Sequence, residues 1–373
     1  MFRTPLPESA VAGQRRTTIS GPHACTRQEQ RRAKEFTSQG TKKINSAHRD
    51  FLICYFVISA AKRFAMTTRR SFIRQSSLAA GALLMPRTNL FASKQLIGLQ
   101  LYTLRNEIFK SAKAGATEEA ANIKTILEKV AAIGYTSVEA FGFNAGKYFG
   151  LSVEDFANII KQNNLKSPSG HYSLDAYLLK GDEDSLKMII DAAKIMGHDF
   201  VTVPFLGDGL RKSADDYKQL SEKLNKAGEV VKGAGLKLAY HNHNFEFKDW
   251  GNGQIGFHIM LQETDPKLVS FEMDMYWVTR AGVKPEDLIK AHPGRFKMWH
   301  IKDMETKKDP STDLSQEQAF TEVGTGIINY KEIFKLKKLS GMEYFFVEQD
   351  QTKIPVYESI SKSYQNLKNN ILA

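Results

Sequence analysis

The sequence predicts one (β/α)₈ TIM barrel over residues 93–373, a single domain preceded by an N-terminal export signal. From residue 96 onward, short apolar runs alternate with amphipathic stretches, and about 280 residues suffice for eight strand–helix pairs. Glycines 134, 197, 235 and 341 follow the helical stretches, where a left-handed C-cap is favoured. The turn at residues 100–105 lacks the Gly-x-Gly-x-x-Gly loop that a doubly wound sheet often carries after its first strand.

The elements follow from the spacing of the apolar residues. Short apolar runs predict strands at residues 97–103, 137–141, 166–172, 200–204, 236–243, 268–273, 297–302 and 344–348. Apolar residues at i, i+3 and i+4 predict helices at 118–133, 153–163, 183–196, 214–233, 284–291 and 330–339, with a closing helix at 354–372. The long polar stretch 305–320 is expected to form a loop over the barrel mouth.

The charge of the chain is concentrated at its beginning. The whole sequence has a net charge of +11, but residues 1–92 hold 16 basic and 4 acidic residues, against 36 and 37 in residues 93–373. A nearly neutral barrel argues against nucleic acid as a partner. Both cysteines, Cys25 and Cys54, also precede residue 93, so a metal in the barrel must be bound by His, Asp and Glu.

Residues 66–92 contain the parts of an export signal. Arg69 and Arg70 precede a short apolar stretch at 78–85, and Ala92 provides a small residue at a plausible cleavage point. The arginine pair resembles a twin-arginine signal, which predicts recognition by that export machinery and a periplasmic or otherwise exported protein. A basic N-terminus without a targeting role is the alternative. After signal removal we expect no stable membrane association, because the apolar stretch is too short to span a bilayer.

Residues 1–65 are polar, rich in arginine and without periodicity, apart from an apolar run at 51–61. Met66 stands directly before the signal. We therefore expect residues 1–65 to be a non-native extension or a disordered N-terminal arm.

Ionisable residues follow the predicted strands five to eight. The strand ends read Tyr-His-Asn-His-Asn-Phe-Glu at 240–246, Glu-Met-Asp at 272–274, His-Ile-Lys-Asp at 300–303 and Glu-Gln-Asp at 348–350. Side chains alternate along a strand, so residues 241 and 243, 272 and 274, and 300 and 302 are each expected to share a face. Because the C-terminal strand ends of such a barrel meet at one mouth, they predict a mixed imidazole–carboxylate metal site. Such ligands suit Mn²⁺, Zn²⁺, Co²⁺ or Fe²⁺ better than Ca²⁺. For each residue alone, a hydrogen-bonded position at the rim is the alternative.

These motifs resemble the sugar phosphate isomerase/epimerase family, which has a xylose isomerase-like TIM barrel. The resemblance covers residues 96–372, in order, and includes Gln-Leu-Tyr-Thr-Leu-Arg at 100–105, Val-Glu-Ala-Phe-Gly at 138–142 and Val-Gly-Thr-Gly at 323–326. The fifth-strand and seventh-strand motifs, at 240–247 and 300–303, are moderately specific together and weak alone.

The resemblance implies one divalent metal ion held by a residue from each of strands five to eight. By position these ligands are His241, Asp274, His300 and Glu348. Many members have a glutamate at the fifth-strand position, where this chain has His241. Glu246 reaching back to the metal is therefore the alternative ligand, although His241 is favoured because it lies on the predicted strand itself.

The implied reaction removes a proton next to a carbonyl while the metal stabilises an enediolate. Glu348 is the expected base, with Glu246, His243 or Lys302 as its partner. Lys302 would donate to the oxyanion, unless it is a surface lysine or one paired with Asp303.

His171, Glu139, Tyr102 and Trp277 are the expected substrate-binding residues. A rim hydrogen bond for His171, a structural ion pair for Glu139 and barrel packing for the two aromatic residues are the alternatives.

The expected function is therefore a metal-dependent sugar isomerase or epimerase. Residues 93–373 contain only the arginines 105, 211, 280 and 295, few for binding a phosphate, and export would remove the enzyme from cytoplasmic sugar phosphates. We therefore expect a small-molecule sugar without phosphate, such as a keto-glycoside. A keto-sugar lyase or dehydratase, a non-catalytic periplasmic sugar-binding barrel and an endonuclease IV-like DNA-repair enzyme are the alternatives. The sequence leaves the oligomeric state open.

Overall fold

The computed structural model describes residues 97–110 and 116–373. The predicted extension, the predicted export signal and their boundaries lie outside the described residues and stay predictions. Among the described residues, no helix combines the length and the apolar character that crossing a bilayer requires.

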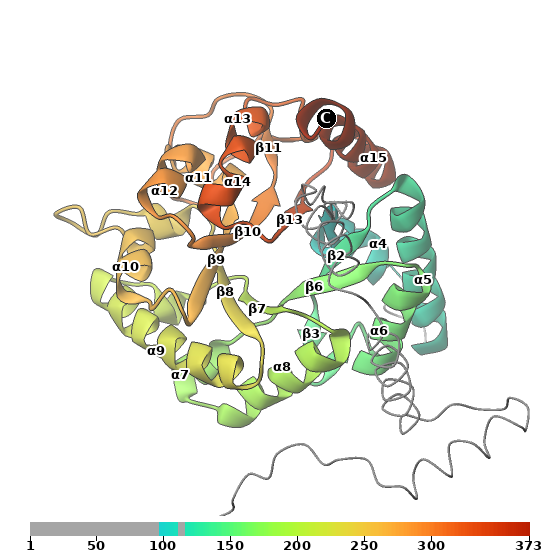
Figure 1. The fold of residues 1–373 in the computed structure, drawn as a ribbon, viewed down its shortest axis with the longest axis horizontal. Helices are drawn as coiled ribbons and strands as arrows, with labels where there is room; N and C mark the ends of the chain where they lie inside the picture. Colours follow the sequence, from blue (N-terminus) through green and yellow to red (C-terminus); the bar gives the residue numbers. More distant parts are fainter. Residues whose placement is uncertain (1–96, 111–115) are drawn as a thin grey trace, which may run out of the picture. The chain divides into compact units, whose positions relative to one another are not determined.

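Eight parallel strands close into a barrel, which confirms the predicted fold (Figure 1). The barrel strands are β1 (Gly98–Gln100), β2 (Ser137–Ala140), β6 (Lys166–His171), β7 (Phe200–Val203), β8 (Lys237–His241), β9 (Val269–Asp274), β10 (Phe296–Ile301) and β13 (Tyr344–Val347). Each strand pairs with its neighbours in this order, and β1 closes the circle by pairing with β13. All eight strands lie where the apolar runs predicted them.

Two strands end two or more residues earlier than predicted. β1 stops at Gln100 because Leu101–Leu104 form a 3₁₀ turn, in which the amide of Tyr102 donates to the Gln100 side-chain oxygen at 3.0 Å. β8 stops at His241, and the amide of His243 instead donates to the Glu246 carboxylate, 2.9 Å away. The expectation that His241 and His243 share one face of a strand is therefore wrong.

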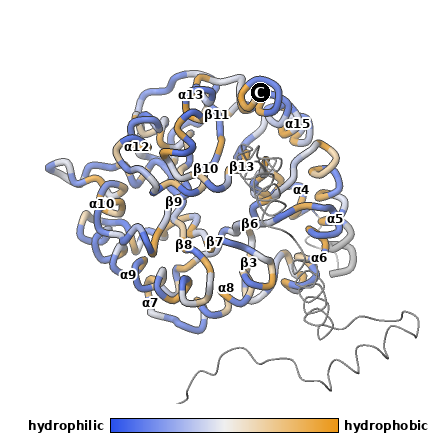
Figure 2. Tube along the Cα trace, viewed as in Figure 1, coloured by the Kyte–Doolittle hydropathy of each residue, from blue (hydrophilic) through white to orange (hydrophobic). Residues whose placement is uncertain are grey.

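Helices surround the strands, as Figure 1 shows in the view along the barrel. They are α4 (Arg105–Phe109), α5 (Ala116–Ile133), α6 (Val153–Gln162), α7 (Asp175–Lys180), α8 (Glu183–Met196), α9 (Ala214–Gly233), α10 (Gly256–Glu263), α11 (Met275–Arg280), α12 (Pro285–Ala291), α13 (Tyr330–Lys335), α14 (Lys337–Ser340) and α15 (Val356–Asn366). Hydrophobic and hydrophilic positions alternate along the outer helices (Figure 2), as expected for helices with one buried face. The apolar spacing did not predict α4, α7, α10 and α11, which have too few turns for a clear helical period.

Shorter elements follow several of the barrel strands. A three-stranded sheet, β3 (Phe143–Asn144), β4 (Lys147–Tyr148) and β5 (Leu151–Ser152), follows β2. After β10, the pair β11 (Asp303–Met304) and β12 (Phe320–Thr321) encloses the predicted polar loop. Residues 208–210 and 245–247 form 3₁₀ turns, and Leu367–Ile371 continue α15 as a π-turn.

An apolar floor fills the interior of the barrel below its mouth. Phe200, Ala239, Met298 and Phe346 form a separate buried cluster inside the ring of strands. Side chains alternate along a strand, so the residues two positions further point inward at the next level. At that level stand His241, His300 and Glu348, and the floor thus supports the ionisable residues at the mouth.

His198 is a buried histidine that lies just before β7. Its side chain is 4% exposed and hydrogen-bonds to the Ser167 hydroxyl at 3.0 Å and the Tyr172 hydroxyl at 3.1 Å. Burial disfavours the imidazolium and lowers the pKa of His198 to about 3. The folded state therefore stays neutral at this position under conditions where an unfolded histidine, with a pKa of about 6.5, takes up a proton.

This difference predicts a loss of stability as the pH falls below about 6.5. Between pH 7.5 and pH 5 the protonation of His198 in the unfolded chain should cost about 2 kcal/mol. A His198→Gln variant has no histidine to protonate at this position. The difference between the free energies of unfolding of the wild type and the variant should therefore shrink by about this amount between pH 7.5 and pH 5. Urea unfolding of both proteins at the two pH values measures it. An equal gap at both pH values would contradict the assignment.

Candidate metal centre

The four predicted metal ligands lie together at the barrel mouth. His241, Asp274, His300 and Glu348 each offer a ligand atom, and these atoms lie within 4.8 Å of one another. All four side chains are buried, although each belongs to a residue type that is costly to bury alone. His171, His241, Glu272 and His300 form a second, overlapping group with the same spacing. The residues of both groups, together with Lys302, are called the cluster below.

The distances show how closely the first group converges. Nδ1 of His300 lies 2.7 Å from Oε2 of Glu348 and 3.9 Å from Oδ2 of Asp274. Nε2 of His241 lies 3.9 Å from the same Asp274 oxygen. Neighbouring donors in tetrahedral coordination at about 2.0–2.1 Å are separated by roughly 3.3 Å, so small side-chain shifts would suffice.

Asp274 is fixed by the chain on both sides. Its amide donates to the Asn242 side-chain oxygen at 3.1 Å, which ties the end of β9 to the residue after β8. Its Oδ1 accepts the Trp277 amide at 3.0 Å and so caps the N-terminus of α11. These bonds leave Oδ2 directed toward the cluster.

Lys302 places a positive charge among three carboxylates. Its Nζ lies 2.8 Å from Glu348, 2.9 Å from Asp350 and 3.1 Å from Asp274. Although burial lowers the pKa of Lys302, these carboxylates outweigh it and raise the pKa well above its usual value. Lys302 is therefore held as an ammonium group.

The alternative in which Lys302 pairs with Asp303 is wrong. Asp303 points instead into the loop after β12, where its carboxylate accepts backbone amides at 2.8–3.2 Å. The donors are Met304, Gly324, Gly326 and Ile328. A Cβ at Gly326 would lie 2.3 Å from both the Asp303 carboxylate and the Met304 carbonyl, so only glycine fits there. The Val-Gly-Thr-Gly motif thus serves this carboxylate–backbone contact.

Glu139, His171 and Glu272 lie beside the first group. His171 Nε2 stands 2.9 Å from Glu272 and 3.2 Å from Glu139. Nε2 of His300 lies 2.6 Å from the Glu139 carboxylate. Gln100 and Ser169 donate to the same carboxylate at 2.7 Å and 2.5 Å. The side chains of Glu139 and Glu272 are fully buried.

Charge compensation governs the pKa values in this mouth. Burial lowers the pKa of His171 and His300, but the neighbouring carboxylates outweigh it and raise the pKa of His171 to about 9 and that of His300 well above its usual value. Burial raises the pKa of Glu348, but Lys302 and His300 outweigh it and hold that pKa well below the usual range. Burial raises the pKa of Asp274 to about 6.

Glu246 and His243 belong to neither metal-ligand group, although the centre of the His243 ring lies 5.1 Å from that of His241. The Glu246 carboxylate accepts the Tyr240 hydroxyl at 2.6 Å, and Tyr240 alternates with the inward-pointing His241 on β8. Burial raises the pKa of Glu246 to about 7. The His243 ring packs against Phe245 and Trp277, 5.6 and 5.5 Å between ring centres. Burial lowers the pKa of His243 to about 3, so its imidazole is neutral at physiological pH.

The two predicted aromatic substrate contacts differ in their surroundings. Trp277 is 5% exposed and lies next to the cluster, with Nζ of Lys302 5.6 Å from its ring centre. Tyr102 is 39% exposed, lies in the turn after β1 and stacks under the Arg105 guanidinium at 4.3 Å. The structure therefore brings Trp277, but not the Tyr102 ring, into contact with a member of the cluster.

The cluster fits a divalent cation. In the described part of the chain, three of its buried atoms form no hydrogen bond: Oε1 of Glu272, Nδ1 of His241, which lies 3.2 Å from another Glu272 oxygen, and Oδ2 of Asp274, which lies 3.1 Å from the Lys302 ammonium. Leaving such atoms unpaired costs free energy. Two imidazoles and two carboxylates form the kind of mixed N/O set that Zn²⁺, Mn²⁺, Co²⁺ and Fe²⁺ accept. His241, Asp274, His300 and Glu348 would hold the ion.

Sequence reasoning missed several partners in this mouth. Glu272 was expected to share its face of β9 with Asp274 but was given no role, although this alternation was a signal that it also points inward. Asp350 follows Glu348 by two residues, which was a similar signal. Gln100, Ser169 and Asn242 gave no such signal, because their roles depend on strands that become neighbours only in the closed barrel.

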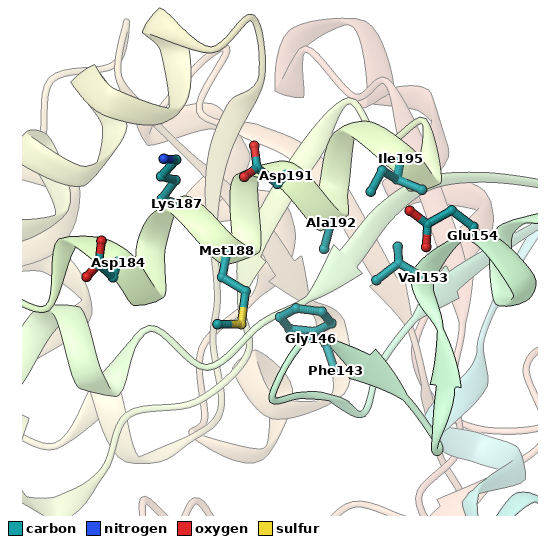
Figure 3. A pocket seen from close by; sticks show the side chains of 10 residues that line it. All are labelled: Phe143, Gly146, Val153, Glu154, Asp184, Lys187, Met188, Asp191, Ala192 and Ile195. Atoms are coloured by element: carbon teal, nitrogen blue, oxygen red, sulfur yellow. The ribbon is translucent and has the colours of Figure 1, made fainter. Parts of the chain in front are cut away.

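Two surface pockets lie elsewhere. One pocket of about 350 Å³ lies between α8 and the start of α6, and Figure 3 shows Phe143, Met188 and Ile195 among the side chains lining it. Another, of about 460 Å³, is lined by residues that precede β8, β9 and β10 and so opens at the opposite end of the barrel. Neither pocket is lined by a residue of the cluster.

The chain is similar to proteins of one barrel family. It is 30% identical to the inosose dehydratase of Clostridium perfringens over 146 residues, which are 37% of this chain and 48% of that protein. The chain thus spans about half the length of the curated relatives it matches. Two solved sugar phosphate isomerase/epimerase structures from Parabacteroides distasonis are 26% and 27% identical, with TM-scores of 0.62 and 0.59. The matches cover 77% and 74% of this chain and 99% and 98% of those chains.

The model of the family described as xylose isomerase-like TIM barrel matches residues 127–366. This match extends from α5 to α15 and includes seven of the eight barrel strands and all four predicted metal ligands. The closed barrel and the resemblance drawn from the sequence motifs agree with it. The chain therefore belongs to the xylose isomerase-like TIM barrel family.

Proposed function

We propose that this protein is a divalent-metal-dependent enzyme that isomerises or epimerises a sugar by moving a proton next to a carbonyl group. One observation carries the proposal: His241, Asp274, His300 and Glu348 converge, buried, beside the Lys302 ammonium at the mouth where such barrels place their chemistry. When bound, the metal would act as a Lewis acid on the oxygen atoms of the substrate.

The side chains around the ion divide the remaining work. Lys302, held as an ammonium by its carboxylate neighbours, donates to the substrate oxygen on which negative charge develops. Glu348, kept ionised by Lys302 and His300, accepts the proton next to the carbonyl. Nδ1 of His243 has no hydrogen-bond partner in the described part of the chain, and this neutral imidazole contacts a substrate hydroxyl. The Trp277 ring forms an apolar wall.

Glu246 is a weaker candidate for the partner base. Its raised pKa suits proton transfer near neutral pH, but Tyr240 and the His243 amide occupy its carboxylate. Its use in catalysis would require these two bonds to break.

The arginines of the barrel support a substrate without phosphate. All four have guanidinium groups that donate to backbone carbonyls: Arg105 to Tyr102 and Asp350, Arg211 to Leu206, Arg280 to Asp309, and Arg295 to Leu261. A phosphate is bound best by an arginine with a free two-pronged donor edge. We propose an unphosphorylated sugar or keto-glycoside, reached by an enzyme exported through its twin-arginine signal.

A dehydratase or lyase on the same site is the second candidate, because several relatives are inosose dehydratases. Elimination of water from a keto-polyol begins with the same proton abstraction next to the carbonyl. The two reactions separate afterwards, when either a proton returns to carbon or the neighbouring hydroxyl leaves. A barrel that binds sugar without turnover is the remaining alternative.

The proposal predicts one bound divalent ion and metal-dependent exchange of a carbon-bound proton. The purified protein is analysed for metal, stripped with a chelator, reloaded and incubated in ²H₂O with unphosphorylated ketoses, keto-glycosides and cyclic keto-polyols. Deuterium incorporation followed by NMR should depend on the metal. Ultraviolet absorbance of a conjugated enone would identify the dehydratase instead.

The His300→Ala, Glu348→Gln double variant should lose the metal and reduce exchange by at least about a hundredfold. Glu322→Gln is the matched control, because Glu322 is also buried but belongs to neither metal-ligand group and bonds to Ser359 and Lys362. A double variant that keeps its ion would refute the ligand assignment. A metal-loaded protein that binds sugars without exchange would support the non-catalytic barrel.

Lys302→Met separates metal binding from catalysis. Removing the ammonium removes a cation that competes for Asp274 and Glu348, so the metal should bind as tightly as before or more tightly. Exchange should fall by roughly a hundredfold or more, because the developing oxyanion loses its donor. Lys353→Met, which removes an exposed lysine paired with Glu305, is the control. Full exchange activity in Lys302→Met would remove this residue from the proposed mechanism.

A further inference from the structure

The two overlapping ligand groups make different demands on the same histidine. Metal binding by the first group uses Nδ1 of His300, which faces Glu348 and Asp274. Binding by the second group requires Nε2 of His300, which faces Glu139. An imidazole nitrogen binds a metal only through a free lone pair, so the group that holds the ion depends on which nitrogen carries the hydrogen.

Glu139 engages Nε2 of His300. The Oε2 of Glu139 lies 2.6 Å from this nitrogen, and the carboxylate also accepts Gln100 Nε2 at 2.7 Å and Ser169 Oγ at 2.5 Å. Ser169 is held in turn by Thr202, with 2.9 Å between the hydroxyl oxygens. Glu139 is 0% exposed, so the carboxylate is fixed at the end of β2 by donors on β1 and β6.

In the second group, a nitrogen of His171 also hydrogen-bonds to a carboxylate. Nε2 of His171 hydrogen-bonds to Glu272 at 2.9 Å and lies 3.2 Å from Glu139. Nε2 of His171 and Nε2 of His300 thus both face Glu139, which belongs to neither ligand group. Nδ1 of His300 instead faces Glu348, which is itself a ligand of the first group. Metal-binding histidines usually donate their second N–H to a carboxylate, which fixes the ring and its tautomer.

We propose that Glu139 is a positioning residue that accepts the Nε2 hydrogen of His300 and thereby leaves Nδ1 as the metal ligand. Nδ1 faces Glu348 and Asp274, so this tautomer supports metal binding by His241, Asp274, His300 and Glu348. Gln100 and Ser169 hold the Glu139 carboxylate in place. This inference rests on the proposed metal-dependent function and adds a role outside the ligand set.

Two substitutions of Glu139 test the length and the charge of its side chain separately. Glu139→Gln keeps the length of the side chain but replaces one acceptor oxygen with an NH₂ donor. The amide therefore cannot accept all three hydrogen bonds that Gln100, Ser169 and His300 donate to the carboxylate. Glu139→Asp keeps the charge, but it is one methylene shorter and withdraws from His300. If Glu139 acts by position, each variant should bind Zn²⁺ or Co²⁺ roughly 10–100-fold more weakly.

The measurement is a competition titration of the metal-free full chain against a chromogenic chelator, combined with the visible absorption spectrum of bound Co²⁺. The Glu139 variants should bind one ion per chain and keep the wild-type Co²⁺ bands, because the four ligands are unchanged. Asp274→Asn should change the bands, because it alters a ligand. Glu322→Gln, which changes a buried glutamate that belongs to neither ligand group, should match the wild type in both readouts.

Three results would overturn the inference: wild-type affinity in Glu139→Asp, altered Co²⁺ bands in both Glu139 variants, or two ions per chain. The first would mean that only the charge of Glu139 matters, and the second that Glu139 is itself a ligand. If the Glu139 variants do not fold, Ser169→Ala keeps the glutamate but loosens it, and unchanged affinity there counts against the inference. Failure of the wild type to bind any ion would instead refute the proposed function.

Discussion

The mouth of this barrel depends on the compensation of buried charge. Glu139, Glu272, Asp274 and Glu348 lie within hydrogen-bonding or ion-pair distance of the same few imidazoles, and none is more than 4% exposed. Carboxylates in such a site are too costly to keep without cations nearby. The Lys302 ammonium and the raised pKa values of His171 and His300 supply part of that positive charge. A divalent ion would supply more, and it would give a partner to atoms of His241, Glu272 and Asp274 that form no hydrogen bond in the described part of the chain.

The fold makes this arrangement attainable because it separates two tasks along each strand. Ala239, Met298 and Phe346 fill the interior, and two residues further along their strands stand His241, His300 and Glu348. The apolar floor excludes water below the mouth, which strengthens every electrostatic contact above it. Local bonds then set the direction of each ligand: the helix cap of α11 directs Asp274, and the Glu139 carboxylate directs His300. The packed core and the proposed metal ligands therefore occupy successive inward-facing positions of the same short strands.

The sequence predicted the parts of the structure that depend on local pattern. The eight strands, most of the long helices and the strand ends that carry His241, Asp274, His300 and Glu348 all follow from periodicity and from ionisable residues after apolar runs. What the sequence missed depends on distant residues. The hydrogen bonds of Gln100 and Ser169 to Glu139 join three strands, and Asn242 reaches across to β9. The end of β8 and the partner of Lys302 were mispredicted, because the competing acceptors, Glu246 and Asp350, gain their roles from loop geometry.

The central claim is that one divalent ion binds between strands β8, β9, β10 and β13. Anomalous diffraction from a crystal of the Zn²⁺- or Mn²⁺-loaded protein, recorded on both sides of the metal absorption edge, locates the ion without reference to activity. The account predicts a single peak at about 2.0–2.2 Å from His241, Asp274, Nδ1 of His300 and Glu348. A peak coordinated by His171 and Glu272 through Nε2 of His300, or no peak at the mouth, would contradict it.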